Sequence, residues 1–439
     1  MTFKGTVRIK ILLLLTILVF SMFGLVFISP APYELEIITK SRFVPNPGDY
    51  DEHVDYFFID DVAECEGYLY ICGYRSNPMW PFLAKFNDNG SIEWYRILKI
   101  YGNVLFRYMG LITVDKAGYA YFLTTRTVNQ PNSSSLSNVS PVLLKIAPNS
   151  TIVWEKIIGV AVNITWFYSI NYMHDDTILI LGKSPSNEIV LTKLTLNGEI
   201  IWSVHDDVNL NITNARVALS NYSIYVFVEG IEKYVYKDLI MIKYSNTGHK
   251  VSSIILRKGY VLSTELIDIE YSNVDNEIVL LFDDNMLYKV SPDGLIKFER
   301  NLSADEYTYY GEIAIDNKGN IYAVKPSSAG VSILKLDRSL NIIHTYFIEV
   351  AESENEETTL AHRNAIFIKN DNLYLFLSVG KINYHIWAVY LKLREQINPL
   401  FITLSISLAA STAICVAFLM KMINIHKLRE TQHNPKNNL

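Results

Sequence analysis

The chain has 439 residues, a formal net charge of −6 and a hydrophobic content of 50%. This acidic balance excludes nucleic acid as a partner, because a protein that binds phosphates needs a basic surface to release their counterions. The 29 tyrosines, 20 phenylalanines and 6 tryptophans favour pleated strands over helices. The chain is long for one ordinary core, but a closed array of repeats accommodates that length.

The first element in chain order is an apolar segment, Ile11 to Ile28, which contains no charge and follows three basic residues, Lys4, Arg8 and Lys10. Its length approaches the ~20 residues that cross a bilayer as a helix. A cleaved signal peptide is the alternative interpretation. Because the segment does not end in a clean cleavage site, we expect an uncleaved signal anchor over 11–29, preceded by a cytoplasmic tail over 1–10.

Seven short apolar strands follow, and each carries a lysine close to its end. These are Lys85, Lys145, Lys193, Lys243, Lys289, Lys335 and Lys392. Successive lysines are 46 to 60 residues apart, and most lysine strands run into a turn and a further strand, as at Asn197-Gly198. A period in this range indicates a repeat architecture. We expect the stem of each lysine to cover apolar neighbours while its ammonium group reaches water.

The sixth repeat shows the unit most clearly. Four short strands, Glu312–Ile315, Ile321–Val324, Val331–Leu336 and Ile342–Tyr346, are separated by turns or polar loops and predict an antiparallel meander. Repeated four-stranded units in a radial array form a β-propeller. The sequence therefore predicts an all-β fold, a seven-bladed propeller over 33–393.

The seventh repeat, Asn364 to Leu393, supplies only three strands, whereas an isolated alternating strand, Tyr33 to Thr39, precedes the first complete repeat. We expect this N-terminal strand to be the missing outer strand of the last blade. Such a closure removes exposed sheet edges, which otherwise pair with other chains.

A second apolar segment, Leu400 to Met420, follows the expected propeller. Basic residues come after it, Lys421 and Lys427 among them. We expect a transmembrane helix over 399–423 and a cytoplasmic tail over 424–439. The expected protein spans the cell membrane twice, with both termini cytoplasmic, the propeller extracellular and the lipid bilayer as a partner. Both helices should leave the propeller from the face that carries the turns between first and second strands and between third and fourth strands.

Eight Asn-x-Ser/Thr triplets lie between the two apolar segments and are candidate glycosylation sites. They begin at Asn89, Asn132, Asn138, Asn149, Asn163, Asn211, Asn221 and Asn301.

Two further patterns concern disulfides and metals. Cys65 and Cys72 flank an expected hairpin, but a bridge between them would need a bulge or a wide loop, and no metal-ligand spacing occurs. Acidic stretches at Asp49–Asp61 and Glu352–Glu357 would suit Ca²⁺ or a basic partner, or else remain solvated loops. Ca²⁺ is the one cofactor that the sequence leaves open.

The face opposite the expected membrane helices carries aromatic side chains that combine an apolar body with a polar tip, as at protein and glycan interfaces. The alternative is that these rings pack the loops. The candidate residues are Trp80, Tyr234, Tyr236, Tyr307, Tyr309, Tyr310, Tyr384 and His385.

Val114–Tyr121 and Leu143–Trp154 resemble the exported bacterial and archaeal β-propeller repeats of the quinoprotein-like superfamily. The resemblance implies the fold, whereas activities differ among members, which include quinone-dependent dehydrogenases, outer-membrane assembly scaffolds and cell-surface proteins without an assigned role. A quinoprotein dehydrogenase would need a calcium site, a catalytic aspartate and usually vicinal cysteines, and this chain has no adjacent cysteine pair. Hydrolase and nucleotide-binding motifs do not occur either.

The sequence thus predicts no catalytic or cofactor-binding residues. We expect a non-catalytic binding or interaction module of the cell envelope, with an envelope protein or glycan as the partner. Two alternatives stay open: an envelope enzyme that acts on glycans or small molecules, and a sensor ectodomain that relays a signal through a partner.

Overall fold

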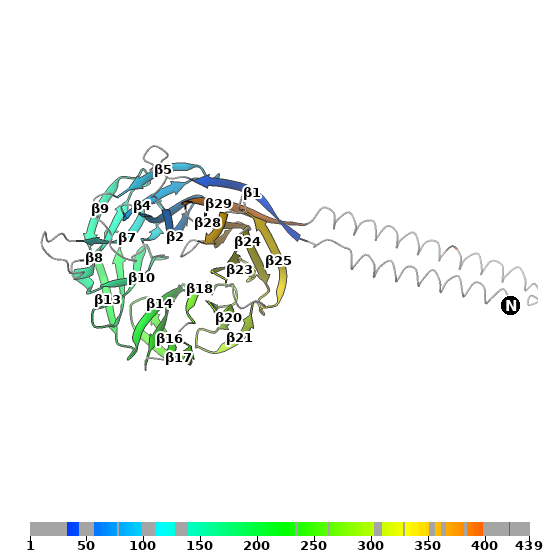
Figure 1. Cartoon of the computed structure of the whole chain (residues 1–439). Coiled ribbons are helices and arrows are strands. Elements are labelled where there is room, and N and C mark those ends of the chain that lie inside the picture. The colour runs from blue at the N-terminus through cyan, green and yellow to red at the C-terminus, as the bar shows by residue number, and fades with distance from the viewer. Residues whose placement is uncertain are drawn as a thin grey trace, which may run out of the picture. The chain divides into compact units, whose positions relative to one another are not determined.

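The computed structural model describes residues 33–43, 57–76, 79–98, 110–127, 139–232, 236–261, 264–302, 310–327, 330–350, 356–360, 366–381, 384–397 and 421. Ile37–Leu393 forms one compact unit, which is a ring of seven β-sheets (Figure 1). A second unit comprises Met1–Glu36 and Arg394–Leu439. Its described residues are the outer ends of two strands and Lys421, which is helical.

Six blades each consist of four consecutive antiparallel strands, and the first strand of each blade lies nearest the centre of the ring (Figure 1). Blades 1 to 3 contain β2 (Phe57–Cys65), β3 (Tyr68–Ser76), β4 (Met79–Phe86), β5 (Ile92–Ile97); β6 (Leu111–Val114), β7 (Ala120–Thr127), β8 (Val139–Ile146), β9 (Ile152–Ile157); and β10 (Trp166–Met173), β11 (Thr177–Lys183), β12 (Ile189–Thr195), β13 (Ile200–Asp206). A single-turn helix, α2 (Gly159–Val162), connects β9 to β10.

Blades 4 to 6 follow the same order. They contain β14 (Asn211–Leu219), β15 (Ser223–Ile231), β16 (Tyr236–Ser245), β17 (Lys250–Val261); β18 (Leu266–Ser272), β19 (Glu277–Phe282), β20 (Met286–Val290), β21 (Ile296–Asn301); and β22 (Glu312–Ile315), β23 (Ile321–Pro326), β24 (Gly330–Leu336), β25 (Ile342–Glu349). The prediction of an all-β seven-bladed propeller is confirmed.

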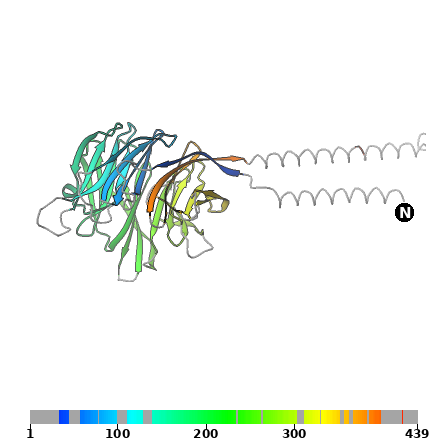
Figure 2. The same cartoon turned by 45° about the horizontal axis from the view of Figure 1, so that its top comes forward.

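The seventh blade is closed by the N-terminal strand, as predicted. Its strands are β26 (Glu356–Leu360), β27 (Ile366–Lys369), β28 (Asn372–Lys381), β29 (Tyr384–Ile397) and β1 (Tyr33–Phe43). β1 pairs with β29, and the two strands run side by side in both views (Figures 1 and 2). We expected a single innermost strand in this blade. The structure has two short ones, because β26 and β27 pair with different halves of β28.

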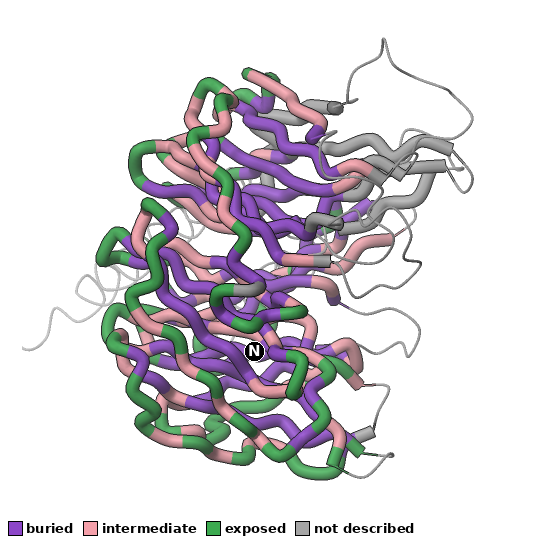
Figure 3. Tube along the Cα trace, turned by 90° about the vertical axis from the view of Figure 1, so that its left-hand side faces the viewer, coloured by how far each residue is buried: buried purple, intermediate pink, exposed green. Residues whose placement is uncertain are grey.

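Hydrophobic clusters between neighbouring blades form the core. One cluster combines Leu191 of blade 3 with Val226 of blade 4, and another joins Phe86 of blade 1 to Phe376 of blade 7, across the closure. The second and third strands of the blades are buried along most of their length, for example β11, β12 and β15. The outer strands mostly alternate between intermediate and exposed positions (Figure 3). No blade could bury both of its faces alone, so each blade depends on its neighbours for stability.

The recurring lysine occupies the same structural position in every complete blade. It lies on the third strand, and the pairing with the fourth strand shifts by one residue immediately after it, for example between Lys85 and Phe86 and between Lys289 and Val290. This irregularity is a β-bulge, which increases the local twist. The residue opposite the lysine on the second strand is often tyrosine, such as Tyr121 facing Lys145, whose ammonium lies 5.2 Å from the ring centroid.

The ammonium group does not simply reach water, so that prediction was wrong. In blades 2, 3 and 5 it donates to a backbone carbonyl in the turn between third and fourth strands of the next blade. The bonds are Lys145 to Leu196 (3.2 Å), Lys193 to Asn246 (3.2 Å) and Lys289 to Arg338 (2.8 Å). We call these the inter-blade lysine contacts.

Two further lysines contact the same turn of the next blade through a carboxylate. Lys392 of blade 7 lies 2.5 Å from Asp88 of blade 1, across the closure, and Lys243 of blade 4 lies 4.0 Å from Asp293 of blade 5. The lysines of the remaining two repeats contact their own blades: Lys85 pairs with Glu93 at 2.7 Å, and Lys335 lies over the ring of Tyr322.

The predicted membrane helices, 11–29 and 399–423, and the tails, 1–10 and 424–439, lie outside the described residues, apart from Lys421. Among the helical residues that are described, no stretch has the length and apolar character that a membrane span requires.

Replacing the lysine with the best-buried ammonium tests the inter-blade contacts. Lys289 contacts Asp275 at 2.8 Å and Glu277 at 2.9 Å, and its side chain is 2% exposed. Lys289→Met should lower the free energy of unfolding by about 3 kcal/mol. This is the lower end of the usual cost of breaking a buried ion pair, because Glu277 keeps Lys297 and Asp275 keeps Arg338 as basic partners.

Urea unfolding of the full chain in detergent, followed by tryptophan fluorescence, measures this loss. The matched control is Lys116→Gln, which removes an exposed pair with Asp176 and should leave the urea midpoint nearly unchanged. Equal effects of the two substitutions would contradict a stabilising role for the buried lysine.

Candidate functional site in the central channel

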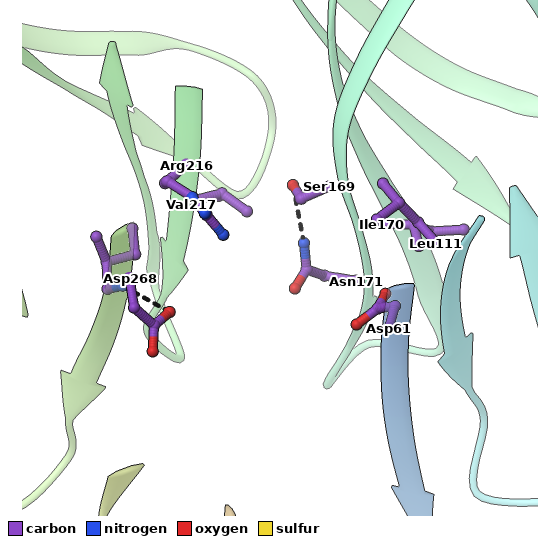
Figure 4. A pocket seen from close by; sticks show the side chains of 9 residues that line it. Asp61, Leu111, Ser169, Ile170, Asn171, Arg216, Val217 and Asp268 are labelled. Atoms are coloured by element: carbon purple, nitrogen blue, oxygen red, sulfur yellow. Dashed lines mark hydrogen bonds between the residues drawn. The ribbon is translucent and has the colours of Figure 1, made fainter. Parts of the chain in front are cut away.

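The inner strands of blades 1 to 5 surround a cavity on the axis of the ring. Its volume is about 60 Å³, and its lining residues are Asp61, Leu111, Ser169, Ile170, Asn171, Arg216, Val217, Asp268 and Ile269. Asp268 and Arg216 lie on one side, whereas Ser169, Asn171 and Asp61 lie on the other (Figure 4). Residues up to 207 positions apart in sequence, Asp61 and Asp268, therefore meet at one site.

The two carboxylates of the cavity each accept hydrogen bonds from the backbone of the following blade. Asp61 accepts from the N–H of Ile112 at 2.9 Å, and Asp268 accepts from the N–H of Ile313 at 2.9 Å. Each also accepts from the N–H of the residue that follows it in sequence. These bonds give both aspartates a structural role in joining neighbouring inner strands.

Other inner strands use the same device. Asn214 of β14 donates to the carbonyl of Leu266 at 2.9 Å, and Glu312 of β22 accepts from the N–H of Ile366 at 3.2 Å. Polar residues on the inner strands thus replace the hydrogen bonds that a strand at the centre of the ring cannot obtain from a sheet neighbour.

Arg216 differs from these residues. It lies on β14 two positions after Asn214, and its Nε is buried without a hydrogen-bond partner. Across the cavity, the side-chain amide of Asn171 donates to the hydroxyl of Ser169 at 3.3 Å, as Figure 4 shows. The cavity therefore has three polar side chains that do not hold the backbone of a neighbouring blade: Arg216, Asn171 and Ser169.

Glu270 lies two residues after Asp268 on β18. Burial, together with the charge of Asp268, raises the pKa of its carboxyl from 4.5 to about 8. This shift favours the protonated form of the carboxyl at neutral pH.

Three of the predicted outer-face residues have described side chains, and they lie in different blades. Trp80 lies in β4 of blade 1 and is half-buried. Tyr236 is the first residue of β16 in blade 4 and is 54% exposed, whereas Tyr310 precedes β22 of blade 6 and is buried. The backbone N–H of Tyr310 donates to the side chain of Asn285. Because Tyr310 is buried, its ring belongs to the packing of blades 5 and 6 and not to a contact surface.

The side chains of the other candidate residues on this face are not among those that the structure describes. Tyr234, Tyr307 and Tyr309 lie outside the described residues, and only the backbone of Tyr384 and His385, at the start of β29, is described.

The described glycosylation candidates are all accessible. Asn89, Asn149, Asn163, Asn211, Asn221 and Asn301 are exposed, and Asn132 and Asn138 lie outside the described residues. Exposure meets the requirement that a glycan be attached at the surface, and their modification remains a prediction.

The cysteines and acidic stretches form no described bridge or metal site. Cys65 pairs in register with Tyr68, whereas Cys72 pairs with Asp61, and both thiols are free. Asp60 and Asp61, the described side chains of the first acidic stretch, are buried and bind the backbone of blade 2. In the part of the chain that the structure describes, no group of acidic, histidine or cysteine residues has metal-binding geometry.

The sequence interpretation missed the channel residues Arg216, Asn171 and Asp268. A usable signal was present, because Arg216 and Asp268 are charges inside otherwise largely apolar first strands. Since seven first strands converge on one axis, charges there meet across blades.

Comparison with known proteins gives likenesses among solved structures only. No family profile matches the chain, and no curated protein matches it. Among solved structures, the chain is similar to "BamB from Moraxella catarrhalis", with 12% sequence identity, a TM-score of 0.43, and coverage of 81% of this chain and 99% of that one.

The raised pKa of Glu270 predicts a pH dependence. A carboxyl whose pKa is higher in the folded than in the unfolded chain contributes stability that is complete below pH 4.5 and is lost as the pH rises through about 8. Glu270→Gln should therefore flatten the fall in melting temperature over this range, as measured by thermal unfolding of the full chain.

The control is Glu299→Gln, which alters an exposed glutamate of β21 and should keep the wild-type slope. An unchanged slope in Glu270→Gln would show that this carboxyl is ionised in the folded protein at neutral pH.

Proposed function

We propose that the chain is a membrane-anchored propeller of the cell surface and acts as a non-catalytic binding or interaction module of the envelope. The proposed anchoring is supported by the two apolar segments and the basic residues at their terminal ends. The binding role is supported by a closed ring of interlocked blades, because rigid scaffolds position loops and channel groups for recognition.

The observation that carries the binding role is the chemistry left in the central cavity. The carboxylates of Asp61 and Asp268 hold the backbone of the next blade, whereas Arg216 has a buried Nε without a partner, and Asn171 and Ser169 bond to each other at the cavity wall. Guanidinium, amide and hydroxyl groups recognise polar ligands through hydrogen bonds. Catalysis by acid and base would instead need a carboxylate or imidazole aimed at the substrate.

An envelope enzyme acting on glycans or small molecules is the second candidate, and Glu270 favours it. A protonated carboxyl beside the carboxylate of Asp268 resembles the pairing that separates acid and base roles in hydrolases. Glu270 does not line the cavity, so this candidate ranks second.

Surface display is tested by cysteine labelling in intact cells. Tyr222 is 84% exposed in the turn between β14 and β15, so Tyr222→Cys should react with a membrane-impermeant maleimide in a cell that displays the propeller. Asn438→Cys, in the expected cytoplasmic tail, should react only after lysis, and the unsubstituted chain gives the background. Labelling of Tyr222→Cys only after lysis would contradict surface display.

The interaction role is tested by photo-crosslinking from two ends of blade 4. A photoreactive residue at Tyr236, beside the connection from β15 to β16, should form adducts with an envelope protein or glycan on intact cells. The same residue at Tyr222 lies at the opposite end of β15 and serves as the control. Absence of adducts from Tyr236, or equal adducts from both positions, would count against the proposed interaction face.

A further inference from the structure

Arg216 and Arg300 differ from the other arginines whose side chains are described, and of these two only Arg216 lines the central cavity. Arg257 packs against the rings of Tyr260 and Phe282, and Arg338 donates its Nε to the carbonyl of Lys318. Arg96 donates to a carbonyl of the next blade. Arg216 forms no ion pair, hydrogen bond or ring contact with any described residue, although it is half-buried and lines the central cavity.

The buried Nε of Arg216 lacks the hydrogen-bond acceptor that burial requires. Removing a guanidinium from water costs free energy unless an opposite charge or several acceptors replace the water. The nearby acidic side chains of the cavity, Asp61 and Asp268, accept backbone N–H groups, and neither forms an ion pair with Arg216. The guanidinium therefore presents a fork of donors to the cavity.

The geometry points to a binding site for a small monoanionic carboxylate, or for the carboxylate group of a larger ligand, on Arg216. The planar fork of a guanidinium matches the two oxygens of a carboxylate. Asn171 and Ser169, which bond to each other across the cavity from Arg216, add an amide and a hydroxyl group to the lining (Figure 4). This site deepens the proposed function, since it rests on the channel of a binding module.

The surroundings limit the charge and the size of the ligand. Asp61 and Asp268 line the same cavity and would repel a dianion such as phosphate more strongly than a monoanion. A cavity of about 60 Å³ has room for a small group only. A short carboxylate satisfies both limits.

Saturation-transfer difference NMR with sodium acetate tests the site on the full chain in detergent micelles. The methyl signal of acetate should show saturation, with a dissociation constant of about a millimolar for so few atoms. Arg216→Gln should weaken binding by about tenfold or more, because a charge-assisted bidentate contact is lost.

The matched control is Arg300→Gln on the outer strand β21, whose Nε is likewise buried without a partner but lies outside the cavity. It should leave acetate binding unchanged. Arg216→Lys keeps the charge without the fork, should bind several-fold more weakly than the wild type, and serves if the glutamine variant does not fold.

Three results would overturn the proposal: no saturation with the wild-type chain, equal saturation in wild type and Arg216→Gln, or displacement of acetate by an equal concentration of phosphate. Failure of acetate binding together with specific crosslinks from Tyr236 would remove the carboxylate site and leave the interaction role intact. Acetate binding without such crosslinks would support the carboxylate site and count against the interaction role.

Discussion

The structure depends on the contact between each blade and the next. A four-stranded sheet in this ring exposes two apolar faces, and both are buried only when neighbours are present on either side. Hydrophobic clusters supply most of this burial, for example where Leu191 of blade 3 meets Val226 of blade 4. The inter-blade lysine contacts fix how neighbouring sheets are placed. Each ammonium group lies at a β-bulge and binds one turn of the next blade, which sets the spacing between the two sheets.

The central channel follows from the same constraint. First strands have no sheet neighbour on the axis, so polar side chains of these strands bind the backbone of the next blade, as Asp61 and Asp268 do. Positions that this arrangement does not use are available for a ligand. Arg216 occupies such a position, and its charge is the feature of the cavity that the fold itself does not explain.

Much of the architecture could be predicted because it is periodic. The lysine spacing identified seven repeats, and the missing strand of the last repeat identified Tyr33–Thr39 as the closing strand, which the structure confirms in β1. The split of the inner position into β26 and β27 was not predictable, because both segments are short and lack alternation. The burial of the lysine ammonium was missed because its acceptors belong to the next repeat, about 50 residues away. The cavity was missed for the same reason, since Arg216 and Asn171 meet only after the ring has closed.

Hydrogen exchange measured by mass spectrometry on the full chain, with and without Lys392→Met, tests the dependence of each blade on its neighbour most directly. Lys392 binds Asp88 across the closure between blades 7 and 1. The account predicts that peptides from β26–β29 and from β2–β5 lose protection together, while β14–β17 on the far side of the ring keep theirs. Loss confined to β29, with β2–β5 unchanged, would contradict the claim that neighbouring blades stabilise one another.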